Sequence, residues 1–339
     1  MRFPPRARRA LLAGAVALGA AVSARLPAGS GESATVADPK PAPRGPVDEK
    51  TLQELLKLPH TEVETVRLVL VPAHVLDRRG RVVQDLRSQD FRLFEDQAPQ
   101  KIEFFSVEGN EPISIAFLLD ISGSMRQSGK LESAKDAVRY LVENLRRGDR
   151  FALVCFADEQ VSWVTEFTSD KTLFLERLDV QEGYGQTALN DAVAAAPELV
   201  DLKTKGRKAI VLITDGVDNA SKLTPSQAAG LAAKVDVPIY TLGFTALPES
   251  LRPKNENPHG SLAMLRGFSD WTGGALFAVH DPDEMKEAVS QIDQELRHQY
   301  LLGYYPSGSK WDGGFRRIQL ETTRSRLVVR ARKGYFATP

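Results

Sequence analysis

The chain has 339 residues, of which 42% are hydrophobic and 26% charged, an ordinary composition for a globular protein that buries a full core. This length fits two domains of roughly 100–200 residues each. The 44 basic and 44 acidic side chains cancel, so no basic surface predicts nucleic-acid binding. Cys155 is the single cysteine, which excludes an intramolecular disulfide, and the apolar run around it predicts a buried thiol.

The first residues are typical of an export signal. Four arginines precede an apolar stretch, residues 10–22, which ends at the small residues Ser23 and Ala24. This order of charged, apolar and small residues is the pattern of a secretory signal peptide. The stretch is shorter than the about 20 residues of a membrane span. We therefore predict a signal peptide over residues 1–24 and a periplasmic or extracellular location, with membrane association only if the signal stays uncleaved.

A linker is expected after the signal. Residues 25–50 are rich in Pro, Ala, Gly and Ser, and their prolines stand among charged residues. Such a segment cannot bury enough apolar surface to fold, so we predict that it is disordered. A short helix is expected around residues 49–58.

Two β-rich segments, residues 51–110 and 298–339, flank the centre of the chain. In the first, a strand is predicted at residues 63–76, a turn at 77–80 and a return strand at 81–83. A hairpin is predicted between residues 91–94 and 101–106. The second reads as three strands, at residues 300–305, 315–322 and 327–331. Neither group is large enough for a stable sheet alone, so we expect the two to pair into one small antiparallel β-domain.

The centre, residues 111–297, alternates strands and helices. Strands are predicted at residues 113–119, 150–156, 208–214, 238–243 and 275–279, with an antiparallel edge strand at 161–167. Helices are predicted at residues 131–146, 170–178, 187–200, 225–235, 261–272 and 283–297. This alternation predicts an α/β fold with a doubly wound, mostly parallel sheet. Thr224 and either Asp281 or Asp283 are expected to cap helices, and Pro197 to kink its helix or end it early.

Oxygen-bearing side chains follow two of these apolar strands. Asp120, Ser122 and Ser124 come directly after the strand at 113–119, and Asp215 follows the strand at 208–214. Thr187 lies on a third, glycine-flanked segment where a helix is expected to begin. Ligand sites of parallel sheets lie beyond the carboxyl ends of the strands, and oxygen-only ligands suit a hard cation such as Mg²⁺. The sequence therefore indicates a cation site at this edge.

The Asp-x-Ser-x-Ser motif, the Thr and the Asp-Gly pair together resemble the metal-ion-dependent adhesion site of the von Willebrand factor A family. The surrounding sequence, from Glu111 to Leu296, is similar to the bacterial secreted branch of that family. The resemblance implies that the five side chains named above bind Mg²⁺, with Mn²⁺ or Ca²⁺ as alternatives. It also implies that the ion accepts an Asp or Glu carboxylate from a partner protein. For Asp191 and Asp218 we expect hydrogen bonding behind the ligands or plain solvation rather than direct ligation.

Other interpretations of these residues compete with the metal site. Serines and aspartates after strands also cap helices and close turns. The segment Gly123–Lys130 resembles a phosphate-binding loop, but it has five residues between its glycines rather than four, so nucleotide binding is not expected. The long segment 243–260 is expected to be a functional or disordered loop.

Enzyme chemistry is not indicated. The sequence has no Gly-x-Ser-x-Gly elbow. None of the five histidines is expected beside the cluster, and all are predicted at the surface or at helix ends. Trp163 and Trp271 are expected in the core, whereas Trp311 fits either an exposed contact or core packing. We predict a non-catalytic, exported, metal-dependent protein-binding module of the adhesion type. The alternative is a structural or assembly factor of the cell envelope, in which the ion only stabilises the fold.

Overall fold

A computed structural model describes residues 67–109, 111–245, 260–308 and 311–338, all within one unit, Glu64–Pro339. The predicted signal peptide, linker and short helix, and most of the segment 243–260, lie outside the described residues. No helix of the described residues is long and apolar enough to cross a membrane.

The centre of the chain forms a six-stranded sheet in the order β10-β9-β8-β5-β6-β7. Its strands are β5 (Ile113–Asp120), β6 (Arg150–Ala157), β7 (Gln160–Thr168), β8 (Arg207–Thr214), β9 (Ile239–Phe244) and β10 (Leu276–Val279). All neighbours are parallel except β7, which runs antiparallel to β6 at the edge. The predicted α/β fold class is therefore confirmed.

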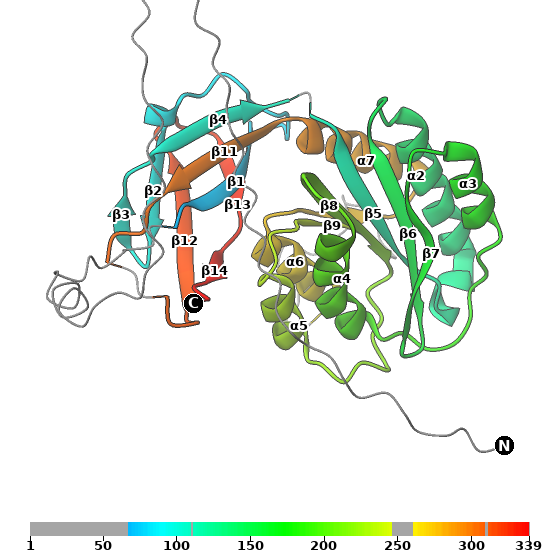
Figure 1. Ribbon diagram of the computed structural model, residues 1–339. Coiled ribbons are helices and arrows are strands. Elements are labelled where there is room, and N and C mark those ends of the chain that lie inside the picture. The colour runs from blue at the N-terminus through cyan, green and yellow to red at the C-terminus, as the bar shows by residue number, and fades with distance from the viewer. Residues whose placement is uncertain (1–66, 110, 246–259, 309–310, 339) are drawn as a thin grey trace, which may run out of the picture. The chain divides into compact units, whose positions relative to one another are not determined.

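Helices cover both faces of this sheet (Figure 1). They are α2 (Lys130–Asn144), α3 (Lys171–Asp179), α4 (Leu189–Lys203), α5 (Pro225–Ala232), α6 (Ser261–Thr272) and α7 (Pro282–Arg297). One core contains Ile115 and Phe117 of β5 together with residues of α2, α3 and α7. The other contains Ala116 and Leu118 with residues of α4, α5 and α6. Because successive side chains of a strand point to opposite faces, β5 supplies both cores and all eight of its residues are buried.

The helix ends confirm two predicted caps and correct one expectation. Thr224 accepts a hydrogen bond from the Gln227 amide at the start of α5, and Asp281 accepts from the amides of Asp283 and Glu284 at the start of α7. Pro197 does not end its helix early, since α4 continues to Lys203. The apolar face of α4 packs on the sheet on both sides of Pro197, and this burial offsets the lost backbone hydrogen bond.

The flanking segments form two antiparallel four-stranded sheets, in the orders β13-β1-β11-β4 and β14-β12-β2-β3. The strands are β1 (Val69–Leu76), β2 (Phe91–Glu95), β3 (Ala98–Gln100), β4 (Phe104–Glu108), β11 (Gln299–Tyr304), β12 (Phe315–Thr322), β13 (Val328–Ala331) and β14 (Gly334–Phe336). Strands from before the central sheet pair with strands from after it: β1 with β11 and β13, β4 with β11, and β2 with β12. Both sheets contribute to one buried core.

Two predicted strand pairings in the first flank are wrong. Residues 81–83 form no return strand, because only an isolated bridge joins Val82 to Leu76. Residues 91–94 and 101–106 do not form a hairpin with each other. Asp96 and Gln97 both adopt positive φ, which closes a tight turn at once and pairs β2 with the short β3. The following strand, β4, is then free to pair with β11.

Two aromatic side chains also differ from expectation. His74, predicted at the surface, is buried in β1, where Nε2 lies 3.1 Å from the Tyr240 hydroxyl and Nδ1 lies 3.3 Å from the His298 carbonyl oxygen. Burial lowers the pKa of His74 to about 3, so this imidazole is neutral. Trp271, predicted in the core, is 38% exposed. Trp311 is partly buried with its ring 6.0 Å from that of Tyr335, and Trp163 packs against the core as expected.

Candidate metal centre

Three loops meet at the carboxyl end of the parallel sheet. The first follows β5, the second precedes α4 and the third follows β8. The Gly123 amide donates to the Gly185 carbonyl at 3.1 Å, which joins the first loop to the second. The Asn219 and Ala220 amides both donate to the Thr187 carbonyl at 3.0 Å, which joins the second to the third. The predicted site residues are therefore carried on one connected backbone framework.

Asp120 ends β5 with its carboxylate fully enclosed. Its Oδ1 accepts a hydrogen bond from the Ser122 amide at 2.9 Å, and its Oδ2 accepts from the Thr214 hydroxyl at 2.6 Å. Burial is the main cause that raises the pKa of Asp120 to about 6; the hydrogen bonds from Ser122 and Thr214 oppose the rise, and the neighbouring Asp215 carboxylate adds to it. A carboxylate held here without a nearby cation is costly, because the interior does not solvate its charge.

Ser122, Ser124 and Asp215 form a row of oxygens beside Asp120. The two serine hydroxyls lie 3.1 Å apart, and Ser124 Oγ donates to Asp215 Oδ1 at 3.2 Å. The Val217 amide also donates to Asp215 Oδ1, at 3.2 Å, which fixes the carboxylate within its own loop. Side chains from β5 and from β8 are thus brought together, as the parallel arrangement of these strands requires.

Thr187 is buried in the second loop, two residues before α4, so it precedes the helix that it was expected to begin. Its amide donates to the Asn219 side-chain oxygen at 2.8 Å. The isolated bridge from Thr187 to Asp158, after β6, fixes the loop from the other side. The structure therefore ties the Thr187 backbone to the loop that begins at Asp215.

Asp191 and Asp218 brace the third loop. Asp191 accepts hydrogen bonds from the Lys222 and Leu223 amides, both at 3.0 Å. Asp218 accepts from the Asn190 amide at 2.9 Å and from the Ser221 hydroxyl at 2.6 Å. Through these hydrogen bonds, both carboxylates hold the third loop against the first turn of α4.

Sequence reasoning missed Lys130 as a member of the site. Its ammonium lies 2.8 Å from Asp215 Oδ2, and the side chains are 30% and 4% exposed respectively. In the segment Gly123–Lys130 the sequence pointed to Ser124 as a ligand and to a likeness with a phosphate-binding loop, but gave Lys130 no role at the metal site. Thr214 and Asn219 were also missed, because their roles depend on where the loops approach one another. The one signal in the sequence was a lysine directly before the helix predicted at residues 131–146.

The residues present fit a hard divalent cation. The five predicted positions supply two carboxylates and three hydroxyls, which are the oxygen ligands that Mg²⁺ accepts. Asp215 already pairs with one positive charge, the Lys130 ammonium. Within the described parts of the chain, no group of three or more His, Cys, Asp or Glu side chains is arranged to hold a metal ion. A site at this edge therefore depends on its serine and threonine hydroxyls.

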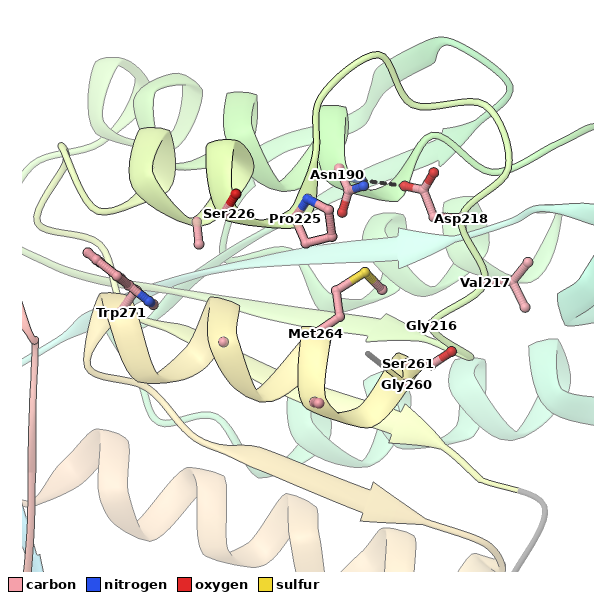
Figure 2. Close-up of a pocket in the computed structure, with 13 residues that line it drawn as sticks. Asn190, Gly216, Val217, Asp218, Pro225, Ser226, Gly260, Ser261, Met264 and Trp271 are labelled. Atoms are coloured by element: carbon pink, nitrogen blue, oxygen red, sulfur yellow. Dashed lines mark hydrogen bonds between the residues drawn. The ribbon is translucent and has the colours of Figure 1, made fainter. Parts of the chain in front are cut away.

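Two hollows adjoin the cluster. A groove of about 900 Å³ is lined by Gly216, Val217 and Asp218 of the third loop and by residues of α5 and α6, among them Met264 and Trp271 (Figure 2). A pocket of about 570 Å³ is lined by Asp215 and Lys130 and, on its far side, by Thr245 and His280. His280 was expected away from the cluster, but it follows β10 and shares this pocket because the strand ends converge.

A doubly wound α/β domain with hydroxyls and carboxylates at the carboxyl edge of its sheet is the architecture of a ligand-binding module. Residues 114–291 match the von Willebrand factor type A domain, and the chain belongs to that family. The family consists of protein-interaction modules, some of which contain a metal-ion-dependent adhesion site.

Curated relatives match the chain over part of their length. An uncharacterized protein of Borreliella burgdorferi is 28% identical over 53% of this chain and 58% of its own length. The inter-alpha-trypsin inhibitor heavy chain H3 of Bos taurus is 25% identical over 42% of this chain and 18% of its own length. The chain thus spans little more than half of the first and less than a fifth of the second.

Solved structures are also similar. Proximal thread matrix protein 1 from the mussel byssus, described with a zinc-occupied MIDAS motif, is 20% identical, with a TM-score of 0.46 over 61% of this chain and 50% of that chain. A von Willebrand factor type A protein from Catenulispora acidiphila is 16% identical, with a TM-score of 0.44 over 70% of this chain and 73% of that chain.

Proposed function

We propose that this protein is an exported, divalent-metal-dependent module that binds a partner protein through an Asp or Glu carboxylate. The proposal rests on one observation: in a von Willebrand factor A domain, the loops after β5 and β8 carry a connected row of hydroxyls and carboxylates beside the fully buried Asp120, and the backbone of Thr187 joins the second loop to them. The proposed ligands are Asp120, Ser122, Ser124, Thr187 and Asp215. Mg²⁺ is the ion we favour, and the signal-like pattern at residues 1–24 supports export.

The chain's own residues prepare the site. The Thr214 hydroxyl and the Ser122 amide orient Asp120, while the Val217 amide orients Asp215. The two carboxylates would balance the charge of a divalent ion, and the Lys130 ammonium beside Asp215 would leave the occupied site with a net positive charge. A bound ion would supply a positive centre that attracts a partner carboxylate. We propose no catalytic step, since binding alone uses every feature of the cluster.

Calorimetric titration of the full chain with Mg²⁺ and with Mn²⁺ tests the site. Wild type should bind one equivalent, and Asp120→Ala should bind none, because it removes the carboxylate at the centre of the cluster. Glu166→Ala is the matched control: this carboxylate pairs with Lys203 in an exposed ion pair and should leave metal binding unchanged. Equal binding by wild type and Asp120→Ala would contradict the assignment.

The same proteins separate a binding role from a purely structural one. Asp120 and Asp215 both accept hydrogen bonds from the chain itself, so the fold should persist without the ion. We expect a chelator to abolish capture of an acidic partner by wild type while circular dichroism stays unchanged. If chelation unfolds the domain instead, the ion is structural and the assembly-factor interpretation holds.

A further inference from the structure

Lys130 and Asp215 form an ion pair inside the proposed metal site. The Lys130 ammonium contacts Asp215 Oδ2 at 2.8 Å, while the other carboxylate oxygen accepts from Ser124 and from the Val217 amide. Both oxygens of this almost buried carboxylate are therefore satisfied by groups of the chain. Hydrogen bonds between charged groups are shorter and roughly twice as strong as neutral ones. The metal-free protein thus holds a cation of its own at the site.

The position of Lys130 in its helix is unfavourable for a cation. It is the first residue of α2, and Gly129, which precedes it, provides no side-chain cap. The first turn of a helix carries the positive end of the helix dipole, which disfavours a lysine there. The ion pair with Asp215 offsets this cost. Lys130 therefore stabilises the Asp215 carboxylate rather than the start of α2.

A divalent ion and this ammonium cannot share Asp215 without strong repulsion. Ser124, a proposed ligand, donates to the same carboxylate that Lys130 contacts, so an ion on Ser124 and Asp215 would lie close to the ammonium. The Lys130 side chain can move away from Asp215, because it lines the pocket of about 570 Å³ together with Ser128, Ser133 and His280. The carboxylate can therefore exchange one cation for the other without a change of fold.

We propose that Lys130 is an internal cation that occupies Asp215 in the metal-free protein, competes with the divalent ion and thereby sets the ion affinity of the site. On this account, the ammonium turns into the adjoining pocket when the ion binds. It then adds a second positive charge beside the ion, where an acidic partner is expected. The inference rests on the proposed metal site and assigns to it a residue that limits its affinity.

Titration of the full chain with Mn²⁺ tests the competition. Lys130→Met removes the competing charge, so its Kd for Mn²⁺ should fall by about tenfold relative to wild type, in line with the loss of one charged hydrogen bond. Lys130→Arg keeps a competing cation, so its Kd for Mn²⁺ should be closer to that of wild type than the Kd of Lys130→Met is. Lys203→Met is the matched control, since it breaks another lysine–carboxylate pair at the far end of α4 and should leave the Kd unchanged.

Thermal unfolding supplies a second readout. Without metal, Lys130→Met should melt below wild type, because the almost buried Asp215 carboxylate then loses its ion pair. The increase in melting temperature on adding Mn²⁺ should be larger in the variant, since tighter binding stabilises the folded state more. Unchanged or weaker Mn²⁺ binding by Lys130→Met overturns the competition and leaves the proposed function intact. Failure of wild type to bind Mn²⁺ overturns both.

Discussion

Asp120 shows how burial and ligation are linked at the scale of one residue. Its carboxylate is 0% exposed at the end of a strand whose residues are all buried. Two hydrogen bonds orient the oxygens, yet neither brings a positive charge. An ion that binds to the deprotonated carboxylate supplies that charge. Proton and metal ion should therefore compete for Asp120, and the competition should appear in stability as well as in affinity.

The pH dependence of stability follows from the direction of the shift. Burial raises the pKa of Asp120 from 3.8 to about 6, so the folded chain holds this proton more tightly than the unfolded chain does. The stability gained from the proton is complete below the unfolded pKa of 3.8 and is lost as the pH rises through about 6. Without metal, the free energy of unfolding of wild type relative to Asp120→Asn should therefore fall across this interval. Urea unfolding at a series of pH values measures this difference.

Asp120→Asn cannot titrate at this position, so it removes the pH dependence that belongs to Asp120 and leaves that of other groups. Mn²⁺ affinity of wild type should increase over the same pH interval, because the ligand must be deprotonated to bind. A constant difference in unfolding free energy between the two proteins across that interval would show that Asp120 is not the group that titrates.

At the residue scale, the sequence predicted which oxygen-bearing side chains share the edge of the sheet. It did not predict the residues that form hydrogen bonds or ion pairs with them. Asp120 and Asp215 each follow an apolar strand, and parallel strands carry their ends to one place. Thr214, Asn219 and Lys130 act through contacts with residues 32 or more positions away along the chain. No local pattern encodes such contacts. His74 was misjudged for the same reason, since Tyr240 covers it from a distant strand.

At the scale of elements, the central strands were predicted within one residue at each end. Strands buried on both faces appear in sequence as unbroken apolar runs, so their positions are clear without tertiary information. The early end of the helix at Pro197 and the hairpin at residues 91–106 were not predicted correctly. In the first case the buried face of α4 carries the helix past the proline, and in the second β4 pairs with β11 instead.

The cap of α5 provides a test at this scale. Thr224 and Gln227 form a reciprocal capping box, in which each side chain bonds to the other's backbone amide. Thr224→Ala removes the capping hydroxyl and should lower the free energy of unfolding by about 1 kcal/mol, a typical cost for a lost cap. Thr224→Ser keeps the hydroxyl and should stay near wild type. Equal unfolding curves for wild type and Thr224→Ala would show that the cap contributes nothing.

At the scale of the whole molecule, strands from both ends of the chain share one core outside the central sheet. Glu95 of β2 is buried and accepts hydrogen bonds from Tyr304 at 2.6 Å and from Tyr335 at 2.9 Å. Burial, together with Glu95, raises the pKa of both phenols, so they stay protonated as donors. One residue before the central sheet thus binds two residues after it. We propose that the two flanking segments form one folding unit, which sequence reasoning anticipated from their small size.

Truncation after Gly314 tests this unit, because it removes β12, β13 and β14. Strand β2 then keeps only β3, a pairing of three residues, and β1 loses one of its two neighbours. Hydrogen exchange of the amides of Phe91–Glu95 should become much faster, since an isolated two-stranded hairpin is at best marginally stable. The amides of β5 should stay protected by the central sheet. Tyr335→Phe in the full chain is the control: it removes one hydrogen bond to Glu95 but keeps every strand, so β2 should remain protected. If truncation leaves the exchange of β2 unchanged, the first flank folds without the second and the single unit is wrong.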